Sequence, residues 1–273
     1  MQIIEQCTIA KNPTAGNEDG IVVTNDFIAV IDGSTSKSNW KINSNISNGR
    51  YCMMLISQFI SQCRYDITLE EMCNEVTLFV RNHYPNHCLS EVENHPEARM
   101  AASCAIYSRH HNEIWMIGDC FCLLNRICYD NPKPYADLLA QKRAEIIIQL
   151  LASRQTTKEE LRDNDLGRKA ILEEMIITMR NQNKTYSVID GFSIPLNKVK
   201  IISLPPKPTE IVLATDGYPI LMPTLSESEE ALRQQAENDP LNIGTFKATK
   251  AFKNGSKSFD DRTYIRFLSA KNE

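Results

Sequence analysis

Short apolar segments that end on an acidic residue constrain this chain more than any other feature of its sequence. The clearest is Phe27–Ile31, a continuous apolar run of strand length that is followed by Asp32 and Gly33. A run without polar alternation predicts a strand that is buried on both faces. Gly33 permits a sharp turn and lets a backbone carbonyl point outward. Asp32 is therefore expected at the exposed end of a rigid core strand.

Acidic residues flank three further predicted strands: Glu210–Thr215 before Asp216, Glu113–Ile117 before Gly118 and Asp119, and Thr263–Phe267 after Asp260 and Asp261. In a mixed or antiparallel sheet, strand ends of this kind fall on one edge, so we expect the acids to lie together. Like charges are not gathered in a protein without compensation. A hard divalent cation bound by carboxylate oxygen is the natural compensation.

Composition and charge exclude several classes of function. The chain has 273 residues, 42% of them hydrophobic, which is enough for a full core. Its net charge of −4 predicts no general attraction to nucleic acid or to an anionic membrane. No apolar run approaches the roughly 18 residues that a membrane-spanning helix needs. The N-terminus has no basic region followed by an apolar segment, so we expect a cytoplasmic protein without a signal peptide.

The nine cysteines do not predict a disulfide framework. Their number is odd and none form a Cys-x-x-Cys pair, which favours buried, reduced thiols. A zinc site would have to come from a single histidine- and cysteine-containing segment: His83, His87, Cys88 and His95. That spacing fits no standard structural-zinc pattern, so a zinc site is the weaker interpretation.

Periodicity predicts the elements that surround these strands. Tyr51–Cys63 and Leu69–His83 have apolar residues at helical spacing, and Thr68 is a plausible N-cap of the second helix with Glu71 three residues on. A helical block follows at about 135–181. We interpret Val199–Ser203 and Ile211–Ala214 as paired strands, and Asp190-Gly191 as a plain turn. No repeat or linker interrupts the chain, so we predict one domain over 1–273, with a helical flap or insert at about 131–190.

In their order along the chain, five motifs resemble those of the metal-dependent serine/threonine protein phosphatases of type 2C, in a divergent, bacterial-like form. They are Asn17-Glu18-Asp19, Ile31-Asp32-Gly33-Ser34, Gly118-Asp119, Leu213-Ala214-Thr215-Asp216-Gly217 and Asp260-Asp261-Arg262-Thr263. Each motif alone is weak, and their order makes the set fairly specific. The resemblance implies an α+β fold, a four-layer α-β-β-α sandwich in which helices flank two mainly antiparallel sheets.

The resemblance also implies a function and a set of site residues. The function is hydrolysis of phosphate monoesters by a water that two Mg²⁺ or Mn²⁺ ions activate, with phosphoserine and phosphothreonine in proteins as substrates and a Ser/Thr kinase as a possible partner. The implied roles differ between residues: Asp32 would bridge the ions, Asp216 and Asp260 would hold the first, Glu18 and the carbonyl of Gly33 would hold the second, and Asp19 and Asp119 would orient bound waters.

Three positions depart from the family pattern. The usual phosphate-binding arginine is Thr14 here, which leaves Lys11 as the nearest upstream cation and as our expected phosphate ligand. A lysine binds phosphate as a point charge and not as a bidentate fork. The usual histidine is Ser34, so a metal-bound water or Lys37 would have to protonate the leaving group. The segment beginning at Asp130 only partly matches the motif for a third metal, which makes a third site doubtful.

Two alternatives to a protein phosphatase stay open. Loss of the arginine and the histidine is compatible with a phosphatase of the same fold that acts on a small phosphorylated molecule. It is also compatible with a binding module that has lost efficient turnover. Retention of Asp32, Asp216 and Asp260 argues against the binding module.

Overall fold

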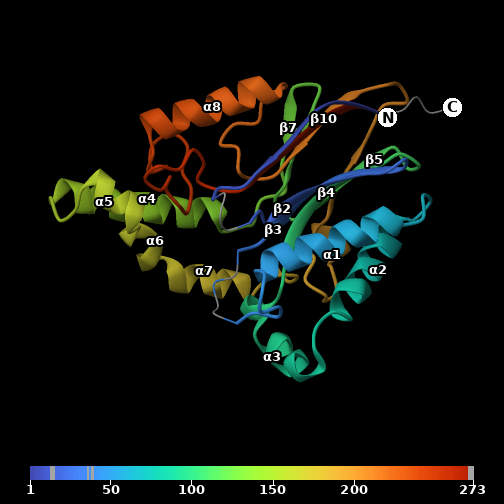
Figure 1. Ribbon diagram of the computed structural model, residues 1–273, viewed down its shortest axis with the longest axis horizontal. Helices are drawn as coiled ribbons and strands as arrows, with labels where there is room; N and C mark the ends of the chain where they lie inside the picture. Colours follow the sequence, from blue (N-terminus) through green and yellow to red (C-terminus); the bar gives the residue numbers. More distant parts are fainter. Residues whose placement is uncertain (13–15, 36, 38–39, 270–273) are drawn as a thin grey trace.

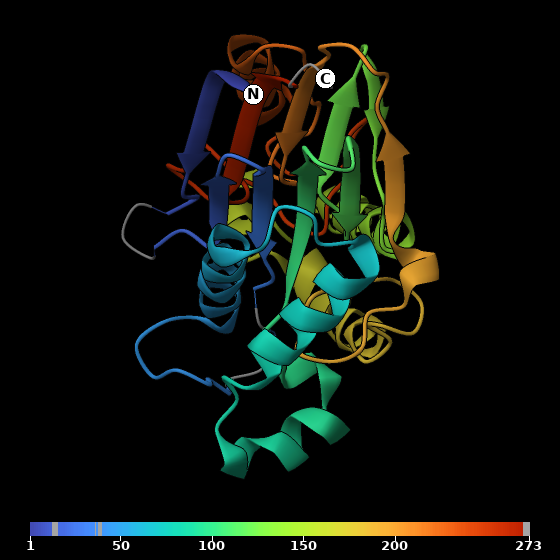
Figure 2. The ribbon, with the colours of Figure 1, turned by 90° about the vertical axis from the view of Figure 1, so that its right-hand side faces the viewer.

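Two antiparallel sheets form the centre of the molecule. The computed structural model describes residues 1–12, 16–35, 37 and 40–269. The first sheet has the strand order β1 (Gln2–Ile9), β10 (Arg262–Leu268), β9 (Glu210–Ala214), β6 (Phe121–Leu124) and β7 (Ile127–Tyr129). The second has the order β2 (Asp19–Val23), β3 (Phe27–Gly33), β4 (Ala102–Ser108), β5 (Glu113–Ile117) and β8 (Lys200–Ser203). Figure 2 shows β1 at the edge of its sheet beside β10.

Helices cover the outer faces of both sheets. Helices α1 (Asn48–Gln62) and α2 (Leu69–Arg81) lie against the second sheet, and α8 (Leu225–Asn238) lies beyond the first (Figure 1). This is the expected four-layer α-β-β-α sandwich, so the predicted fold class is confirmed. The remaining helices are α3 (Leu89–Asn94), α4 (Ala136–Ala152), α5 (Lys158–Asp163), α6 (Leu166–Ala170) and α7 (Leu172–Met179), with 3-10 turns at Asn86–Cys88, Pro96–Ala98 and Leu196–Lys198.

Strand β3 separates two cores, as its unbroken apolar run predicts. Phe27 and Ile31 pack with α1 and α2 in one core, whereas Ile28 and Val30 pack between the two sheets. All five residues of Phe27–Ile31 are buried. Successive side chains of a strand point to opposite faces, so one central strand supports both layers. Asp32 is thereby attached to the most constrained strand of the fold.

Helix α2 begins where the sequence predicts it. Thr68 accepts a hydrogen bond from the backbone N–H of Glu71, and the Glu71 side chain returns one to the backbone N–H of Thr68. This capping box satisfies two donors that the first turn would otherwise leave unpaired.

Within the part of the chain that is described, no helix is long and apolar enough to cross a membrane.

Two of the sequence interpretations are wrong. Strand β8 pairs with β5 in the second sheet, whereas β9 lies between β10 and β6 in the first, so the two strands do not pair with each other. Asp190 is not part of a plain turn: its carboxylate is completely buried and Arg99 Nη1 donates to it at 2.9 Å. A buried carboxylate needs such a partner, which local sequence does not reveal.

Helices α4, α5, α6 and α7 occupy the segment in which the sequence places a helical insert. They lie together toward one end of the sandwich in Figure 1. Arg143 of α4 is fully buried and donates to the backbone carbonyls of Leu241 and Ala248 at 2.9 and 2.8 Å. These bonds attach the insert to the loop that leads into β10. The division of the chain into one domain with a flap stays a prediction.

Candidate functional site

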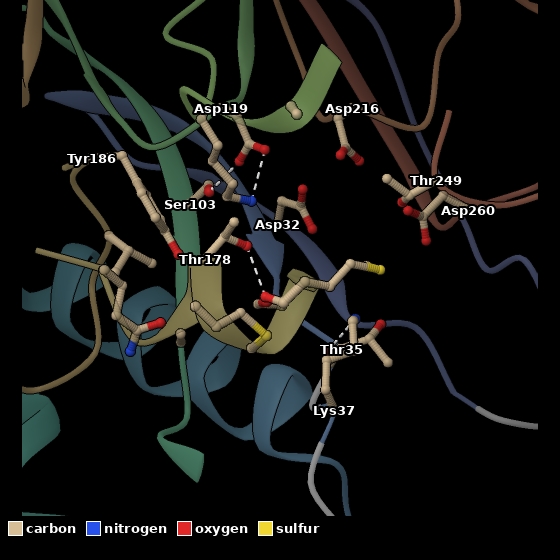
Figure 3. A pocket seen from close by; sticks show the side chains of 18 of the residues that line it. Asp32, Thr35, Lys37, Ser103, Asp119, Thr178, Tyr186, Asp216, Thr249 and Asp260 are labelled. Carbon is tan, nitrogen blue, oxygen red and sulfur yellow. Dashed lines mark hydrogen bonds and ion pairs between the residues drawn. The ribbon is translucent and has the colours of Figure 1, made fainter. Parts of the chain in front are cut away.

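The acidic residues meet at one end of the sandwich, in a cavity of about 200 Å³. Asp32 is the last residue but one of β3 and Asp119 follows β5, both in the second sheet, whereas Asp216 follows β9 and Asp260 precedes β10 in the first. Figure 3 shows these four side chains turned into the same space. The sequence interpretation placed them on one edge of a single sheet. The structure corrects this: the carboxylates converge from two sheets, and we call this space the carboxylate cavity.

Asp19 and Asp32 are cross-strand neighbours, because they face each other in the register of β2 and β3. Like charges in directly opposed positions are destabilising. Asp19 accepts a 2.6 Å hydrogen bond from Thr215 Oγ1. Burial, opposed by this bond and supported by the nearby Asp216, raises the pKa of Asp19 to about 8. Burial and Asp216 also raise the pKa of Asp32 well above its usual value. The paired strands therefore place two carboxyl groups where their charged forms are disfavoured unless a cation binds beside them.

Asp119 is held from both sides. Ser103 Oγ donates to its Oδ1 at 2.6 Å, and Lys133 Nζ lies 2.7 Å from its Oδ2. Burial by itself would raise the pKa of Asp119, but Lys133 and the hydrogen bonds to the carboxylate, including that from Ser103, together outweigh burial and hold that pKa below the ordinary value. Gly118 has a φ of +85°, and a Cβ there would lie 2.2 Å from Ser103 Oγ. A glycine is thus needed for Ser103 to reach the carboxylate.

Glu18 does not line the cavity itself, and its carboxylate is fixed by two hydroxyl groups. Ser47 Oγ donates to its Oε1 and Thr35 Oγ1 to its Oε2, each at 2.5 Å. Ser47 is also the N-cap of α1, so the carboxylate lies beside the positive end of that helix. The predicted acid is therefore anchored by the loop that follows β3 and by the start of α1.

A side chain at position 33 would collide with neighbouring backbone, which explains why this residue is a glycine. It is the last residue of β3, and a Cβ at this position would lie 2.5 Å from the carbonyl oxygen of Gly49 and 2.6 Å from that of Glu18. Helix α1 therefore begins directly against the end of the strand. The sharp turn that we expected from this glycine is less important than the contact between two backbones.

Two lysines, Lys11 and Lys250, pair with the carboxylates beside β10 of the first sheet. Lys11 Nζ lies 3.5, 3.1 and 3.4 Å from carboxylate oxygens of Glu18, Asp260 and Asp261. Lys250 Nζ pairs with the other oxygen of Asp260. Burial and nearby cations lower the pKa of Lys250 to about 8 even though Asp216 opposes them. The structure thus places Lys11 next to the acids, where its charge is already matched.

Asp261, which the sequence interpretation left without a role, joins the N-terminal loop to β10. It accepts hydrogen bonds from the backbone N–H groups of Lys11 at 2.7 Å and Glu18 at 3.1 Å. A carboxylate that accepts several backbone bonds fixes the position of the chain that donates them. Asp261 is nearly completely buried, so these bonds are shielded from water. It therefore aligns Glu18 with Asp260.

The donors of the cavity suit a hard divalent cation. They are carboxylate oxygens, which Mg²⁺ and Mn²⁺ prefer. The side-chain carboxylates of Asp32 and Asp216 form no hydrogen bond or ion pair with any residue in the described ranges, and both residues line the cavity. As these described side chains stand, no three His, Cys, Asp or Glu residues are grouped so that they could hold an ion. In this arrangement the ammonium groups of nearby lysines balance the charge of Asp119 and Asp260, the two acids of the cavity that do form ion pairs.

Three cations and an apolar wall were missed by sequence reasoning. The cations are Lys133, Arg168 and Lys250, whereas Lys37, which also lines the cavity, was predicted as a proton donor. The wall comes largely from the insert: Leu139, Met175, Met179, Tyr186 and Val188. No local pattern separates these lysines and the arginine from ordinary surface residues. Lys133 lies in the segment that we considered for a third metal, and it is this lysine, not Asp130, that lines the cavity. Thr14 lies outside the described residues.

Comparisons with known proteins find a similarity of fold. No protein-family model and no curated protein matches the sequence. The catalytic domain of the serine/threonine protein phosphatase PstP, solved with two manganese ions, is 12% identical, with 97% of each chain covered and a TM-score of 0.46. A serine/threonine phosphatase from Staphylococcus aureus is 13% identical, covering 100% of this chain and 96% of that one, with a TM-score of 0.45. RsbX with magnesium is 12% identical, covering 98% and 99%, with a TM-score of 0.45.

Proposed function

We propose that this chain is a metal-dependent phosphatase that hydrolyses phosphate monoesters, and that its substrates are phosphoserine and phosphothreonine in proteins. One observation carries the proposal: Asp32 and Asp216 arrive from different sheets at one cavity, and neither has a described partner. A fold retains uncompensated carboxylates of this kind where a ligand compensates them.

The proposed ion ligands are Asp32, Asp216, Asp260, Glu18 and the carbonyl of Gly33. When bound there, two Mg²⁺ or Mn²⁺ ions would lower the pKa of water and offset negative charge on the phosphoryl oxygens. Each proposed ligand lies at the end of a strand or is fixed by hydroxyl groups, so the site is built on the rigid part of the fold. Asp19 and Asp119 would orient waters through their free lone pairs.

The reaction requires a proton for the oxygen that leaves phosphorus. Ser34 stands where a histidine would be expected, and its neighbour in the same loop, Lys37, lines the cavity. Burial, together with Arg168 and Lys250, lowers the pKa of Lys37 to about 7. A lysine with a pKa near neutrality is matched to proton donation. We therefore assign leaving-group protonation to Lys37.

A small phosphorylated molecule is the second candidate substrate. It is favoured by the apolar wall of Met175, Met179 and Leu139, which offers contact area to a group larger than a serine side chain. Protein substrates are favoured by the size of the cavity, about 200 Å³, below the roughly 300–1,000 Å³ of a typical small-molecule site. A phosphoserine side chain needs no more room than this.

The experiment compares phosphate release from phosphoserine and phosphothreonine peptides with release from a panel of small phosphorylated compounds. Each substrate is tested in excess chelator, in Mn²⁺ and in Mg²⁺, with Asp216→Asn as the control for contaminating phosphatase. We expect metal-dependent release that is fastest from the peptides. Faster release from a small compound would replace the protein substrate, and no release from any substrate would refute the function.

A further inference from the structure

Two of the cations that line the carboxylate cavity differ from the others in their ion pairing. Lys11, Lys133 and Lys250 each pair with a carboxylate, but Lys37 and Arg168 make no ion pair with any residue in the described part of the chain. The cavity therefore has unpaired positive charge as well as unpaired negative charge. The sequence-based expectation was that Lys11 would supply the only cation for phosphate.

Arg168 is held in place by a network that leaves most of its guanidinium group free. Its Nη1 donates to the carbonyl oxygen of Thr249 at 2.7 Å and to Thr249 Oγ1 at 3.2 Å. Its backbone N–H donates to Asp165, the N-cap of α6, at 2.7 Å. Nε and Nη2 donate to no described residue. A guanidinium group fixed by one edge can offer its other edge to two oxygens of an anion.

Asp165 is itself fixed, so the position of Arg168 is determined by the core of the insert. Arg143, which is fully buried, donates to Asp165 through Nε and Nη2, the latter at 2.7 Å. The same arginine binds the carbonyl of Ala248, next to Thr249. One buried residue thus positions both the helix that bears Arg168 and the loop that fixes it.

Lys37 lies among like charges. Its Nζ donates to the carbonyl of Thr35 at 2.8 Å, and Figure 3 shows the two residues below the carboxylates in that view. Arg168, Lys250 and Lys133 all lie close enough to disfavour its charge. Cations gathered in a partly buried cavity require compensation, as anions do. Lys133 and Lys250 obtain it from aspartates, which leaves Lys37 and Arg168 for an anion from outside the chain.

We propose that Arg168 and Lys37 bind the phosphoryl oxygens of the substrate, in place of the arginine that the N-terminal loop lacks. The inference rests on the proposed function and deepens it. The phosphoryl group would lie between the carboxylates and these two cations, with Arg168 as a bidentate ligand and Lys37 as a point charge. Lys11 keeps its three carboxylate partners and contributes little to phosphate affinity.

The test measures the binding of inorganic phosphate to the full chain in excess chelator, by isothermal titration calorimetry. A charge-assisted hydrogen bond contributes about 1.5–3 kcal/mol, so Arg168→Ala should weaken phosphate binding roughly 10- to 150-fold. Arg168→Lys should recover part of the loss. Lys37→Ala, in a loop outside the core, should weaken binding about 10-fold without risk to the fold. Lys11→Ala should change the affinity less than about 3-fold.

Arg162→Ala is the matched control. Arg162 lies on the neighbouring helix α5 and donates to the carbonyls of Phe252 and Lys253, in the same loop that Arg168 binds, but it does not line the cavity. It should leave phosphate affinity unchanged. Unchanged affinity in both Arg168→Ala and Lys37→Ala, or a larger loss in Lys11→Ala, would overturn the inference. Metal-dependent turnover, measured in parallel on the wild type, shows separately whether the proposed function stands.

Discussion

The guanidinium group of Arg143 is completely buried, and its Nη2 lies 2.7 Å from Asp165 Oδ2. This pair connects α4 with α6, and the same arginine holds the loop before β10 through backbone carbonyls. Breaking a buried pair leaves the remaining charge uncompensated, at a cost of about 3–5 kcal/mol. We expect Arg143→Ala to lower the free energy of unfolding in urea by that amount. Arg162→Ala, whose arginine is partly exposed, should cost less than about 1 kcal/mol. Equal losses in the two variants would contradict the role given to Arg143.

Asp32→Asn should separate catalysis from stability. The pKa of Asp32 is raised in the folded chain, so its charged form destabilises the fold above the pKa of the unfolded chain, about 4. In chelator at neutral pH, the variant should therefore unfold at a higher temperature, by about 2–4 °C for each kcal/mol regained. Below about pH 4 the gain should disappear, because both states of the wild type are then protonated.

Asp32→Asn and Asp216→Asn should each lose all measurable turnover in Mn²⁺, because each substitution removes an anionic ligand from the proposed ion site. Thermal unfolding and turnover are measured on the same preparations. A variant that retains turnover, or one that is less stable than the wild type in chelator, would show that the carboxylate has a structural role.

Anion binding should depend on the protonation of Lys37. Burial, with Arg168, Lys250 and Lys133 nearby, lowers the pKa of Lys37 to about 7 although Glu18 opposes them. A protonated lysine attracts an anion and a neutral one does not, so affinity should fall as pH rises through about 7. Sulfate is the suitable probe, because its own charge is constant across this range. Lys37→Arg should remove the dependence, since arginine stays charged. A wild-type affinity that is level across neutral pH would refute the assignment.

Local sequence patterns predict the elements whose structure is decided locally. The apolar run Phe27–Ile31 became a strand buried on both faces, and Thr68 with Glu71 formed the predicted capping box. Sheet membership is decided by contacts far apart in the chain. After β5, the chain passes Gly118 with a φ of +85° and enters the other sheet. The apolar patterns of β8 and β9 do not encode which sheet each one joins.

The aspartates that line the cavity stood out in the sequence because they adjoin strands, and Lys133, Arg168 and Lys250 were missed because they do not. Arg168 lies on a short helix, and it meets Thr249 across 81 positions of sequence. Lys250 lies in a loop that reads as ordinary basic surface. For Lys11, the sequence predicted a position near Glu18 but not its ion pairs. Two of its three carboxylate partners, Asp260 and Asp261, are about 250 residues away in the sequence, so only the fold brings them together.

The most direct measurement of the central claim is a titration of Mn²⁺ into chelator-treated chain, with hydrolysis of p-nitrophenyl phosphate as the readout. If the carboxylate cavity binds the ions that activate water, the rate should rise from background and saturate with Mn²⁺. Asp216→Asn should remain at background throughout the titration. A wild-type rate that is the same in excess chelator and in saturating Mn²⁺, or one that stays at background in both, would contradict the account.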